Sequence, residues 1–583
     1  MKVLLKFLTP YKKECIIGPF FKLLEAILEL LLPTVMVLVI NKGVLQKDAD
    51  YILKMGVLML LMSLLGFGCS LICQYSAAKA SQGYGTDLRN ALFAHISSFS
   101  YTELDCFGPS TLTTRLTNDI NQLQLAVAML IRLVVRAPFI CIGAIIMAML
   151  LNLRLSLILI AVTPLFIVAL YLIISKTAPL YKRCQQKLDT LSNIVRENLA
   201  GVRVIRGFAK DKHETTRFNR ANDDLTVASN HVAMFSALLS PVTSLIMNMA
   251  IVVTLWAGGF QINAGSFTPG EMIAYINYIT QVLLALIVVS NLVILFTKAS
   301  ASALRVSEIL NRAPSITSIS HASNDLRVPS HVPLVTFSHV SFSYYNTADN
   351  AIEDINFTIN AGQTVGIIGA TGSGKTTLVN LIGRFYETTS GSIKVNNLDI
   401  KNYSLTILRK LIGYVPQQSL LISGTLSENL RLGNEEATDE AIKRACLIAQ
   451  ADDFITSLPE GYHSQVARGG ENFSGGQKQR LAIARALVSR PHLLVLDDSS
   501  SALDFATEAH LRKALNEHLK SMAIIIISQR ASSILKCDQI LVMDDGRIVG
   551  KGSHHELLIN CSTYQEICLS QMSYEEAHLG GTL

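Results

Sequence analysis

Hydrophobic positions divide the chain into two parts of different character. The first three hundred residues or so hold long apolar runs, whereas the remainder mixes apolar and polar positions as a soluble α/β domain does. Six runs are long enough to cross a hydrocarbon layer of about 30 Å, which takes roughly 20 helical residues. These runs are residues 16–40, 52–75, 126–150, 153–174, 236–261 and 271–297. We therefore expect a membrane α-helical domain of six transmembrane helices, followed by an α/β domain.

The composition along the chain also suggests where these domains begin and end. Polar and proline residues gather ahead of the second domain, at Pro314, Ser315, Ser318, Ser320, Ser323, Asn324 and Pro329. We expect a transmembrane domain at 1–300, a linker at 301–333, the α/β domain at 334–570 and a C-terminal tail at 571–583.

The links between the apolar runs predict how the chain lies in the membrane. Two of them, 76–125 and 175–235, are long, and the second is rich in Lys and Arg, which favours the cytoplasmic side. Apolar positions at helical spacing in 185–206 predict that the membrane helices continue into the cytoplasm, with turns at 106–109 and 207–212. The expected protein is multi-pass in the cell membrane, in contact with lipid, with both termini cytoplasmic.

Charge and cysteine content narrow the possible partners. The net charge of +6 is modest and the basic residues form no stripe interleaved with aromatics, so we expect no nucleic-acid partner. The ten cysteines form no C-x-x-C pair and have no His at zinc spacing, which favours reduced, structural thiols. The first apolar run is too long for a cleavable signal and is expected to stay in the membrane.

A glycine-rich stretch in the α/β domain predicts a nucleotide site. It follows a strand-like segment, precedes a helix-like one and fits the pattern G-x-x-x-x-G-K-[ST]. Its residues are Gly369, Ala370, Thr371, Gly372, Ser373, Gly374, Lys375, Thr376 and Thr377. Lys375 is expected to reach the β and γ phosphates of ATP, and Thr376 to offer its hydroxyl to Mg²⁺. Asp497, at the end of the apolar run HLLVLDD, is the expected acidic holder of that ion.

These motifs and those around them resemble the ATP-binding cassette (ABC) transporters, in particular an exporter half-transporter with one membrane and one nucleotide-binding domain. Tyr344 in FSYY stands where the family stacks adenine, and Gln417 in YVPQQ where it has a glutamine for Mg²⁺ and coupling. The family signature appears as FSGGQKQR with Ser474, Gly475, Gly476 and Gln477, and the loop after LLVLDD as Ser501, Ala502, Leu503 and Asp504. In the membrane part, YTELDCFGPSTLTTRLTNDI and LAGVRVIRGFAKDKHE resemble the first and second coupling loops.

The resemblance implies that two chains sandwich two ATP molecules, each between the phosphate loop of one chain and the signature of the other. At two catalytic positions this sequence departs from the family pattern. Asp498 stands where the family has a catalytic glutamate, and Gln529 in IIIISQR where it has a histidine that contacts the γ-phosphate. An aspartate is one methylene shorter, so its carboxylate is withdrawn by about 1.5 Å, and a 1 Å misplacement can cost about 10²-fold in rate. Gln529 cannot carry positive charge.

These departures predict a site that binds ATP and rarely hydrolyses it, with a second half-transporter completing a heterodimer. A homodimer with two slow sites is the alternative. Arg468 stands where exporters usually have a glutamate near the coupling elements, and a solvated arginine explains it equally well.

Charged residues in the apolar runs raise the question of the substrate path. Glu25 and Glu29 share one face of the first helix and are candidates to line it, although for Glu29 a position near the headgroups explains the charge equally well. For Arg132 and Arg136 we favour side chains that reach the headgroups. By analogy with heterodimeric bacterial exporters the expected substrate is small and lipophilic, while peptide, lipid and metal-chelate substrates stay open. An importer on the exporter fold, an ATP-binding regulatory or sensory membrane protein, and a P-loop ATPase attached to an unrelated anchor stay open.

Overall fold

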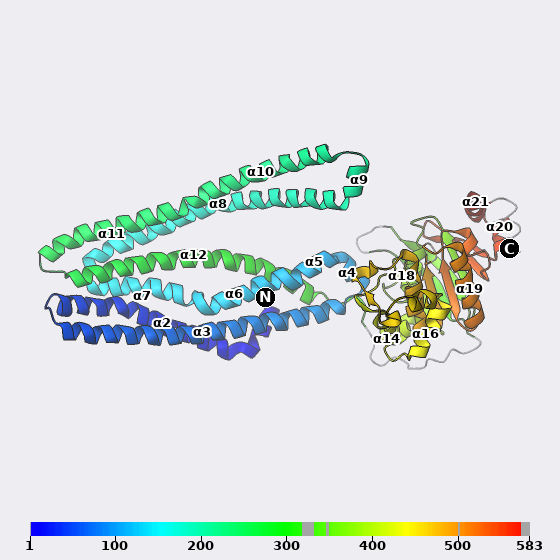
Figure 1. Ribbon diagram of the computed structural model, residues 1–583, viewed down its shortest axis with the longest axis horizontal. Helices are drawn as coiled ribbons and strands as arrows, with labels where there is room; N and C mark the ends of the chain where they lie inside the picture. The colour runs from blue at the N-terminus through cyan, green and yellow to red at the C-terminus, as the bar shows by residue number, and fades with distance from the viewer. Residues whose placement is uncertain (1, 318–331, 345–348, 500–501, 573–583) are drawn as a thin grey trace. The chain divides into compact units, whose positions relative to one another are not determined.

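The computed structural model describes residues 2–317, 332–344, 349–499 and 502–572, and it falls into two compact units (Figure 1). The membrane unit comprises Met1–Ser97 and Ser110–Arg312, and the nucleotide unit comprises Ser98–Pro109 and Ala313–Leu583. The short segment 98–109 therefore groups with the second unit although it lies far from it in sequence.

Six helices of the membrane unit are long and apolar enough to span a bilayer. They cover Val3–Val44, Ala49–Ser97, Pro109–Leu151, Leu153–Ala200, Asp211–Asn263 and Pro269–Asn311. Each contains one of the six predicted runs, so that prediction is confirmed. The described elements of this unit are α1 Lys2–Leu5, η1 Lys6–Tyr11, α2 Lys12–Leu38, η2 Val39–Val44, α3 Ala49–Ser97, α5 Pro109–Thr114, η3 Arg115–Asp119, α6 Ile120–Met129, η4 Leu130–Val134, α7 Arg136–Leu151, α8 Leu153–Ala200, α9 Val202–Gly207, α10 Asp211–Ala237, α11 Leu239–Asn263 and α12 Pro269–Asn311.

The membrane helices run well beyond the apolar segments, as the helical spacing in 185–206 predicted. α3 has 49 residues, so it is about 70 Å long at 1.5 Å per residue. The two predicted turns are present: Gly108 has a φ of +73°, and α9 and α10 are separated by residues 208–210. α12 continues to Asn311, so the first third of the predicted linker is helical; its residues 318–331 lie outside the described ones.

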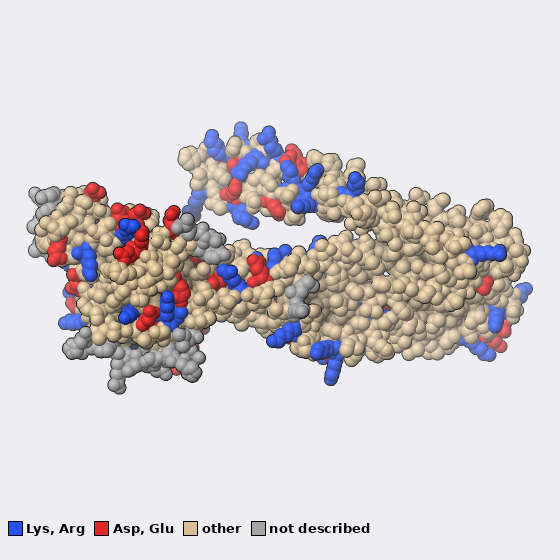
Figure 2. All heavy atoms as spheres, turned by 180° about the vertical axis from the view of Figure 1, so that it is seen from behind, with Lys and Arg blue, Asp and Glu red and all other residues tan. Residues whose placement is uncertain are grey.

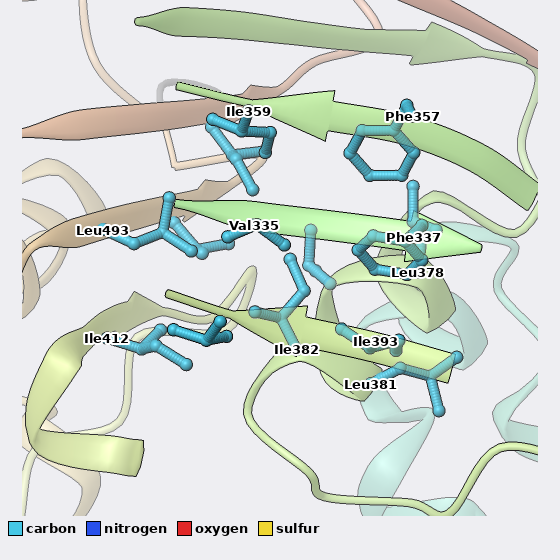
Figure 3. Close-up of a cluster of buried hydrophobic side chains, with 14 of the residues drawn as sticks. Val335, Phe337, Phe357, Ile359, Leu378, Leu381, Ile382, Ile393, Ile412 and Leu493 are labelled. Atoms are coloured by element: carbon cyan, nitrogen blue, oxygen red, sulfur yellow. The ribbon is translucent and has the colours of Figure 1, made fainter. Parts of the chain in front are cut away.

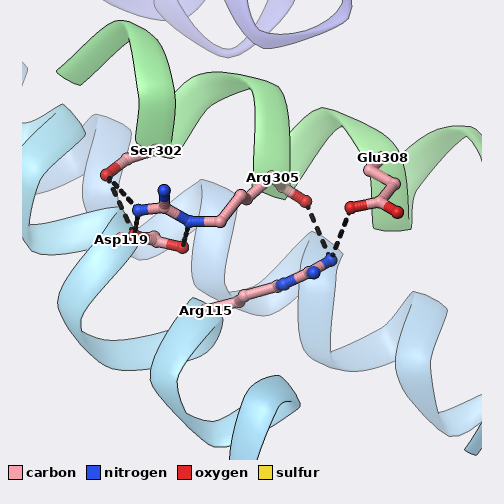
Figure 4. Close-up of polar contacts among 5 residues, drawn as sticks. All are labelled: Arg115, Asp119, Ser302, Arg305 and Glu308. Atoms are coloured by element: carbon pink, nitrogen blue, oxygen red, sulfur yellow. Dashed lines mark hydrogen bonds and ion pairs between the residues drawn. The ribbon is translucent and has the colours of Figure 1, made fainter. Parts of the chain in front are cut away.

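Buried polar contacts tie α12 to the other membrane helices. The Tyr278 hydroxyl donates to the Leu30 carbonyl at 2.8 Å. Further along, the almost fully buried Asp119 of η3 accepts from Arg305 and from the Ser302 hydroxyl (Figure 4). Because an unpaired buried carboxylate would be costly, these bonds fix the register of α12 against η3.

The α8–α10 hairpin carries most of the basic residues of the second long link. Figure 2 shows Lys and Arg side chains gathered over this part of the membrane unit. The exposed ones include Arg183, Lys187, Arg196, Arg203, Arg206 and Arg217.

The described residues of the nucleotide unit form three sheets. A six-stranded sheet has the order β12-β11-β3-β10-β9-β6, a four-stranded sheet the order β2-β1-β4-β5, and β7 pairs with β8. Strands β11, β3, β10, β9 and β6 are parallel, and β12 is antiparallel to β11. The strands are β1 Val335–Phe342, β2 Ile352–Ile359, β3 Thr364–Gly369, β4 Ser390–Val395, β5 Leu398–Asp399, β6 Ile412–Val415, β7 Gly424–Thr425, β8 Gln465–Val466, β9 Leu493–Asp497, β10 Ala523–Ile527, β11 Gln539–Asp544 and β12 Arg547–Gly552.

Helices cover these sheets and close the core. Figure 3 shows Val335, Phe337 and Phe357 of the four-stranded sheet facing Leu378 and Ile382, and these side chains are almost fully buried. The described helices of the unit are α4 Tyr101–Phe107, α13 Lys375–Ile382, η5 Ile400–Asn402, α14 Leu405–Leu411, α15 Leu426–Arg431, α16 Asp439–Ile448, α17 Asp452–Thr456, η6 Gly461–His463, η7 Arg468–Gly470, α18 Gly475–Val488, α19 Phe505–His518, η8 Ala531–Ser533, α20 His554–Asn560 and α21 Ser562–Gln571. This packing holds the start of α13 at the end of β3.

Candidate nucleotide site

The candidate site lies where four neighbouring parallel strands end. β3 leads into the glycine loop, β9 into Asp497 and Asp498, β10 into Gln529 and β6 into Gln417. In open α/β sheets, ligands bind outside the carboxyl ends of the strands. The topology therefore brings together residues that are up to 160 positions apart in the sequence.

The glycine loop needs glycine for its backbone shape. Gly374, with a φ of +93°, is the N-cap residue directly before α13, and a Cβ there would lie 2.9 Å from the Ala351 carbonyl oxygen. A Cβ on Gly369 would lie only 2.1 Å from the Met543 carbonyl oxygen. The strand, loop and helix occur in the predicted order, with α13 starting at Lys375.

Lys375 is buried inside this loop and is held by neutral groups. Its ammonium donates to the carbonyls of Gly369 at 2.9 Å and Ala370 at 2.6 Å, and to the Ser373 hydroxyl at 3.3 Å. Burial lowers the pKa of Lys375, although the nearby carboxylates of Asp497 and Asp498 favour its charged form. An anion at the loop would supply the charge that the carbonyls do not.

Asp497 ends β9 with only 1% of its surface exposed. Its carboxylate accepts from the Thr376 hydroxyl at 3.2 Å and from the Tyr414 hydroxyl at 3.4 Å. Burial raises the pKa of Asp497, and these two hydrogen bonds offset the effect only in part. Thr376 and Asp497, which the sequence assigned to one ion, thus lie in contact.

Asp498 turns away from the strand with a φ of +46° and a backbone N–H bonded to the Ile527 carbonyl at 3.0 Å. Its carboxylate accepts from the Gln417 amide at 3.4 Å. Burial raises the pKa of Asp498, against that hydrogen bond and the positive charge of Arg530. Gln529 follows β10 and lies in the wall of the same cavity.

These residues enclose a cavity of about 400 Å³. Tyr344 forms part of its wall, and the Tyr344 hydroxyl lies 2.9 Å from the Thr377 hydroxyl of the glycine loop. The lining residues are Tyr344, Ala351, Thr371, Gly372, Gly374, Lys375, Thr376, Thr377, Gln417, Asp497, Asp498, Ile527 and Gln529. The structure therefore gathers the phosphate loop, Gln417, both aspartates and Gln529 around one space.

The FSGGQ stretch does not line this cavity and instead begins α18. The Ser474 backbone N–H donates to the Gln477 side chain at 2.9 Å, and the Gln477 N–H donates back to the Ser474 hydroxyl at 3.3 Å. Gly475 and Gly476 form the first turn, so this helix start presents free backbone N–H groups. Of the loop after β9, Ala502, Leu503 and Asp504 are described, with Asp504 capping α19, while Ser501 lies outside the described residues.

Helix α4, in the segment that resembles the first coupling loop, is part of the nucleotide unit. The Glu103 carboxylate, 1% exposed, accepts from the Ser100 backbone N–H and hydroxyl at 2.9 and 2.6 Å and from the Ser315 N–H at 3.2 Å. Burial disfavours the charged form, but these hydrogen bonds outweigh it and hold the pKa of Glu103 below its ordinary value.

The two glutamates that the sequence singled out in the first membrane helix are paired within the chain. Glu25 lies 2.7 Å from the Lys22 ammonium, and Glu29 lies 2.6 Å from the Arg136 guanidinium. Arg136 therefore forms an ion pair with Glu29 of α2, and whether it also reaches the headgroups stays a prediction. For Arg132, the Nε is enclosed with no hydrogen-bond partner in the described part of the chain.

Comparison with known proteins identifies the family. The family model for the ABC transporter transmembrane region matches residues 15–286, and the ABC transporter model matches residues 352–501. An uncharacterized ABC transporter ATP-binding protein of Mycobacterium tuberculosis, Rv1273c, is 36% identical over 576 residues, 98% of each chain. The chain belongs to the ABC transporter family.

Other relatives span its length as well. YfiB of Bacillus subtilis, also named an uncharacterized ABC transporter ATP-binding protein, is 36% identical over 99% of each chain. YheI of the same organism, a probable multidrug resistance ABC transporter ATP-binding/permease protein, is 34% identical over 82% of this chain and 81% of its own. A bacterial Atm1-family ABC exporter with ATP bound has the same fold, with a TM-score of 0.79 at 24% identity over 95% of this chain and 98% of that one.

The residues of this ABC transporter suit ATP and Mg²⁺. A Cβ would fill the cradle at Gly369 and Gly374, so the loop keeps room for backbone N–H groups to face phosphate oxygens. Mg²⁺ prefers oxygen ligands, and the contacting oxygens of Thr376 and Asp497, with Gln417 close to Asp498, offer such a set.

Four residues that contact the residues of the site had no role in the sequence interpretation. Tyr414, which donates to Asp497, lies inside the quoted YVPQQ motif, so an aromatic at the end of a strand was a usable signal. Gln479, whose amide donates to the Asp498 carbonyl at 3.3 Å, lies inside FSGGQKQR. Phe385 and Tyr386 follow α13 without any motif, and only their ring contacts with Tyr414 and Tyr344 reveal them.

Proposed function

We propose that the chain is the ATP-gripping, poorly hydrolytic half of a heterodimeric ABC exporter in the cell membrane. A second half-transporter would supply the catalytic glutamate and histidine. The proposal depends on a contrast between two sets of residues in the cavity. Lys375, Thr376 and Asp497 are in place for phosphate and Mg²⁺. The positions where the family has its catalytic glutamate and histidine hold Asp498 and Gln529 instead.

In this proposal each group of binding residues contacts a different part of the bound MgATP. The backbone of the glycine loop and Lys375 hold the phosphates, while Thr376, Gln417 and Asp497 hold Mg²⁺, which neutralises charge on the phosphates when bound. Tyr344, on the wall of the cavity, stacks on the adenine. Ser474 and the start of α18 serve the pocket of the partner chain, because they lie outside this one.

The hydrolytic residues explain why turnover is slow. A general base must lie within hydrogen-bond reach of the water it activates. The Asp498 carboxylate is one methylene short of the glutamate that does this in the family and lies beside Gln417 at 3.4 Å. Gln529 can donate a hydrogen bond to a γ-phosphate but brings no charge.

Transport and orientation follow from the membrane unit. The basic residues on the α8–α10 hairpin support a cytoplasmic location for the helix extensions and for both termini. The name of YheI supports a small lipophilic drug-like substrate, and six bilayer-length helices fit a path through the membrane. Closure of two nucleotide domains on ATP would open this path outward.

Restoring the two family residues tests the slow pocket. The variant Asp498→Glu/Gln529→His, purified in lipid nanodiscs, should hydrolyse ATP about 10²-fold faster than the wild-type chain. The matched control Asp439→Glu/Gln465→His makes the same two exchanges at exposed positions and should leave the rate unchanged. No gain, in a variant that binds ATP and associates into dimers, would remove the proposed cause.

The partner is tested separately. Affinity purification of the tagged chain from its native membrane should recover a second half-transporter with glutamate and histidine at the positions of Asp498 and Gln529. Recovery of copies of this chain alone would instead indicate the homodimer with two slow sites.

A further inference from the structure

Aromatic side chains form a continuous series of contacts between the nucleotide cavity and helix α4. At the adenine side, the Tyr344 ring meets the Tyr386 ring edge-on, with centroids 5.3 Å apart. The Tyr386 hydroxyl then donates to the Asp105 carboxylate of α4 at 2.6 Å. Two contacts therefore lead from the wall of the cavity to α4.

A second series begins at the proposed Mg²⁺ side. The Tyr414 hydroxyl donates to Asp497 at 3.4 Å, and the Tyr414 ring lies 5.6 Å from the Phe385 ring. Phe385 stacks on Tyr101 of α4, with centroids 4.8 Å apart and planes within 7°. The adjacent residues Phe385 and Tyr386 thus both end on α4, one on its first residue and one on Asp105.

The Tyr386 hydroxyl is the part of this arrangement that packing does not explain. Tyr386 is only 7% exposed, and a phenylalanine would make the same ring contacts with Tyr344 and Phe342. A buried hydroxyl is costly unless it is bonded, and its partner here is a carboxylate on α4. Burial and the Asp105 carboxylate together raise the pKa of Tyr386, so the hydroxyl keeps its proton and its role as donor.

We propose that Phe385 and Tyr386 are positioning residues that transmit the occupancy of the nucleotide cavity to α4. The Tyr344 hydroxyl contacts Thr377 of the phosphate loop, so a nucleotide that occupies that loop or stacks on Tyr344 changes the position of the Tyr344 ring. Tyr386 is packed too closely to stay in place when its neighbour moves, and its hydroxyl carries the displacement to Asp105. Because α4 is joined to α3 and α5 by a few residues, the signal enters two membrane helices.

This inference rests on the proposed contact of Tyr344 with the adenine base, and the chain contains its own reporter for it. Of the ten cysteines, all within the described residues, Cys106 of α4 is the exposed one. The rate at which a maleimide modifies Cys106, followed by mass spectrometry of its peptide, therefore measures a change at α4. The nucleotide is Mg²⁺ with AMP-PNP, which is not hydrolysed, so the readout does not depend on turnover or on a partner.

The full chain in nanodiscs should show a change in the Cys106 rate when AMP-PNP binds. Tyr386→Phe should bind AMP-PNP within about threefold of wild type, because the ring remains, yet lose most of the change at Cys106. Tyr403→Phe, which removes a buried hydroxyl bonded to the Val395 carbonyl, is the matched control and should keep both. Asp105→Asn retains an acceptor for Tyr386 and should keep part of the response.

The outcomes distinguish this inference from the proposed function. A wild-type Cys106 rate that is unchanged at saturating AMP-PNP, or a full response in Tyr386→Phe, would overturn the transmission through Phe385 and Tyr386. Brisk ATP turnover by the wild-type chain would instead count against the poorly hydrolytic pocket and leave the Cys106 result standing.

Discussion

Charged side chains have different kinds of partners in the two units of the molecule. In the membrane unit the described contacts pair charge with opposite charge: Lys22 with Glu25, Arg136 with Glu29 and Arg305 with Asp119. In the nucleotide cavity, Lys375 is bonded to carbonyls and a hydroxyl, and Asp497 to two hydroxyls. The comparison teaches that charges paired within one helix or between two helices serve the structure, whereas charges held by neutral groups are set up for a charged ligand.

The largest expected effect is the loss of MgATP affinity when the charge of Lys375 is removed from the cavity. Lys375→Ala should weaken MgATP binding by at least about 10²-fold, because a buried cation no longer faces the phosphates. Lys22→Met, which removes a lysine that already has its carboxylate, should leave the affinity unchanged. Isothermal titration calorimetry of both variants makes the comparison, and equal effects would show that the two lysines do not differ as described.

The second effect concerns the pair between Glu29 and Arg136. Replacing Arg136 alone with Met should leave the Glu29 carboxylate without its ion-pair partner between two membrane helices and cost about 2 kcal/mol, while Glu29→Gln/Arg136→Met should recover most of it. Thermal unfolding in detergent measures the three variants.

The same residues test the predicted substrate path. If Glu29 lines it, Glu29→Gln should alter the transport of cationic substrates in vesicles that hold the assembled transporter. An unchanged profile together with the stability cycle would leave Glu29 with its structural role.

A smaller effect on stability is expected at Glu103, a buried carboxylate whose charge is stabilised by hydrogen bonds and, among the described residues, not by an ion pair. Its pKa is lowered in the folded protein, so the stabilisation is fully present above the unfolded value of about 4.3 and is lost as the pH falls through the lower folded value. Glu103→Gln should therefore unfold roughly 2–4 °C earlier than wild type at pH 7. The gap should persist to pH 5 and narrow below about pH 4; a gap that widens in acid would contradict the assignment.

The smallest effect is expected at the surface. Lys187 and Asp224 lie 2.5 Å apart on the α8–α10 hairpin, but both side chains are about half exposed. Exposed pairs contribute little because water and salt screen them. Asp224→Asn should give no measurable shift in unfolding temperature, in contrast to Arg136→Met.

Local sequence patterns predicted the helices and strands of this fold well, but they predicted the contacts between these elements less well. The six spans, the strand before Gly369 and the start of α13 at Lys375 follow from hydrophobic spacing and glycine positions, which act over a few residues. The meeting of Gln417 with Asp498 could be expected only through the family resemblance, because strand order depends on contacts that are distant in sequence. The pairing of Arg136 with Glu29 could not be predicted, since it depends on which helix faces lie together.

The same distinction applies within the site. Thr376 and Asp497 belong to motifs and were named from the sequence, whereas Tyr386 has a role only through Tyr344 and Asp105, which lie 42 and 281 positions away. Glu103 was part of a quoted coupling segment, yet its bond to Ser315 requires the linker to return to α4.

The most direct test compares binding and turnover in the wild-type chain alone. In nanodiscs it should bind one MgATP per chain, and phosphate release should be so slow that bound ATP is recovered intact after many minutes. Rapid phosphate release by this chain without any partner would contradict the account, because Asp498 and Gln529 would then suffice for hydrolysis.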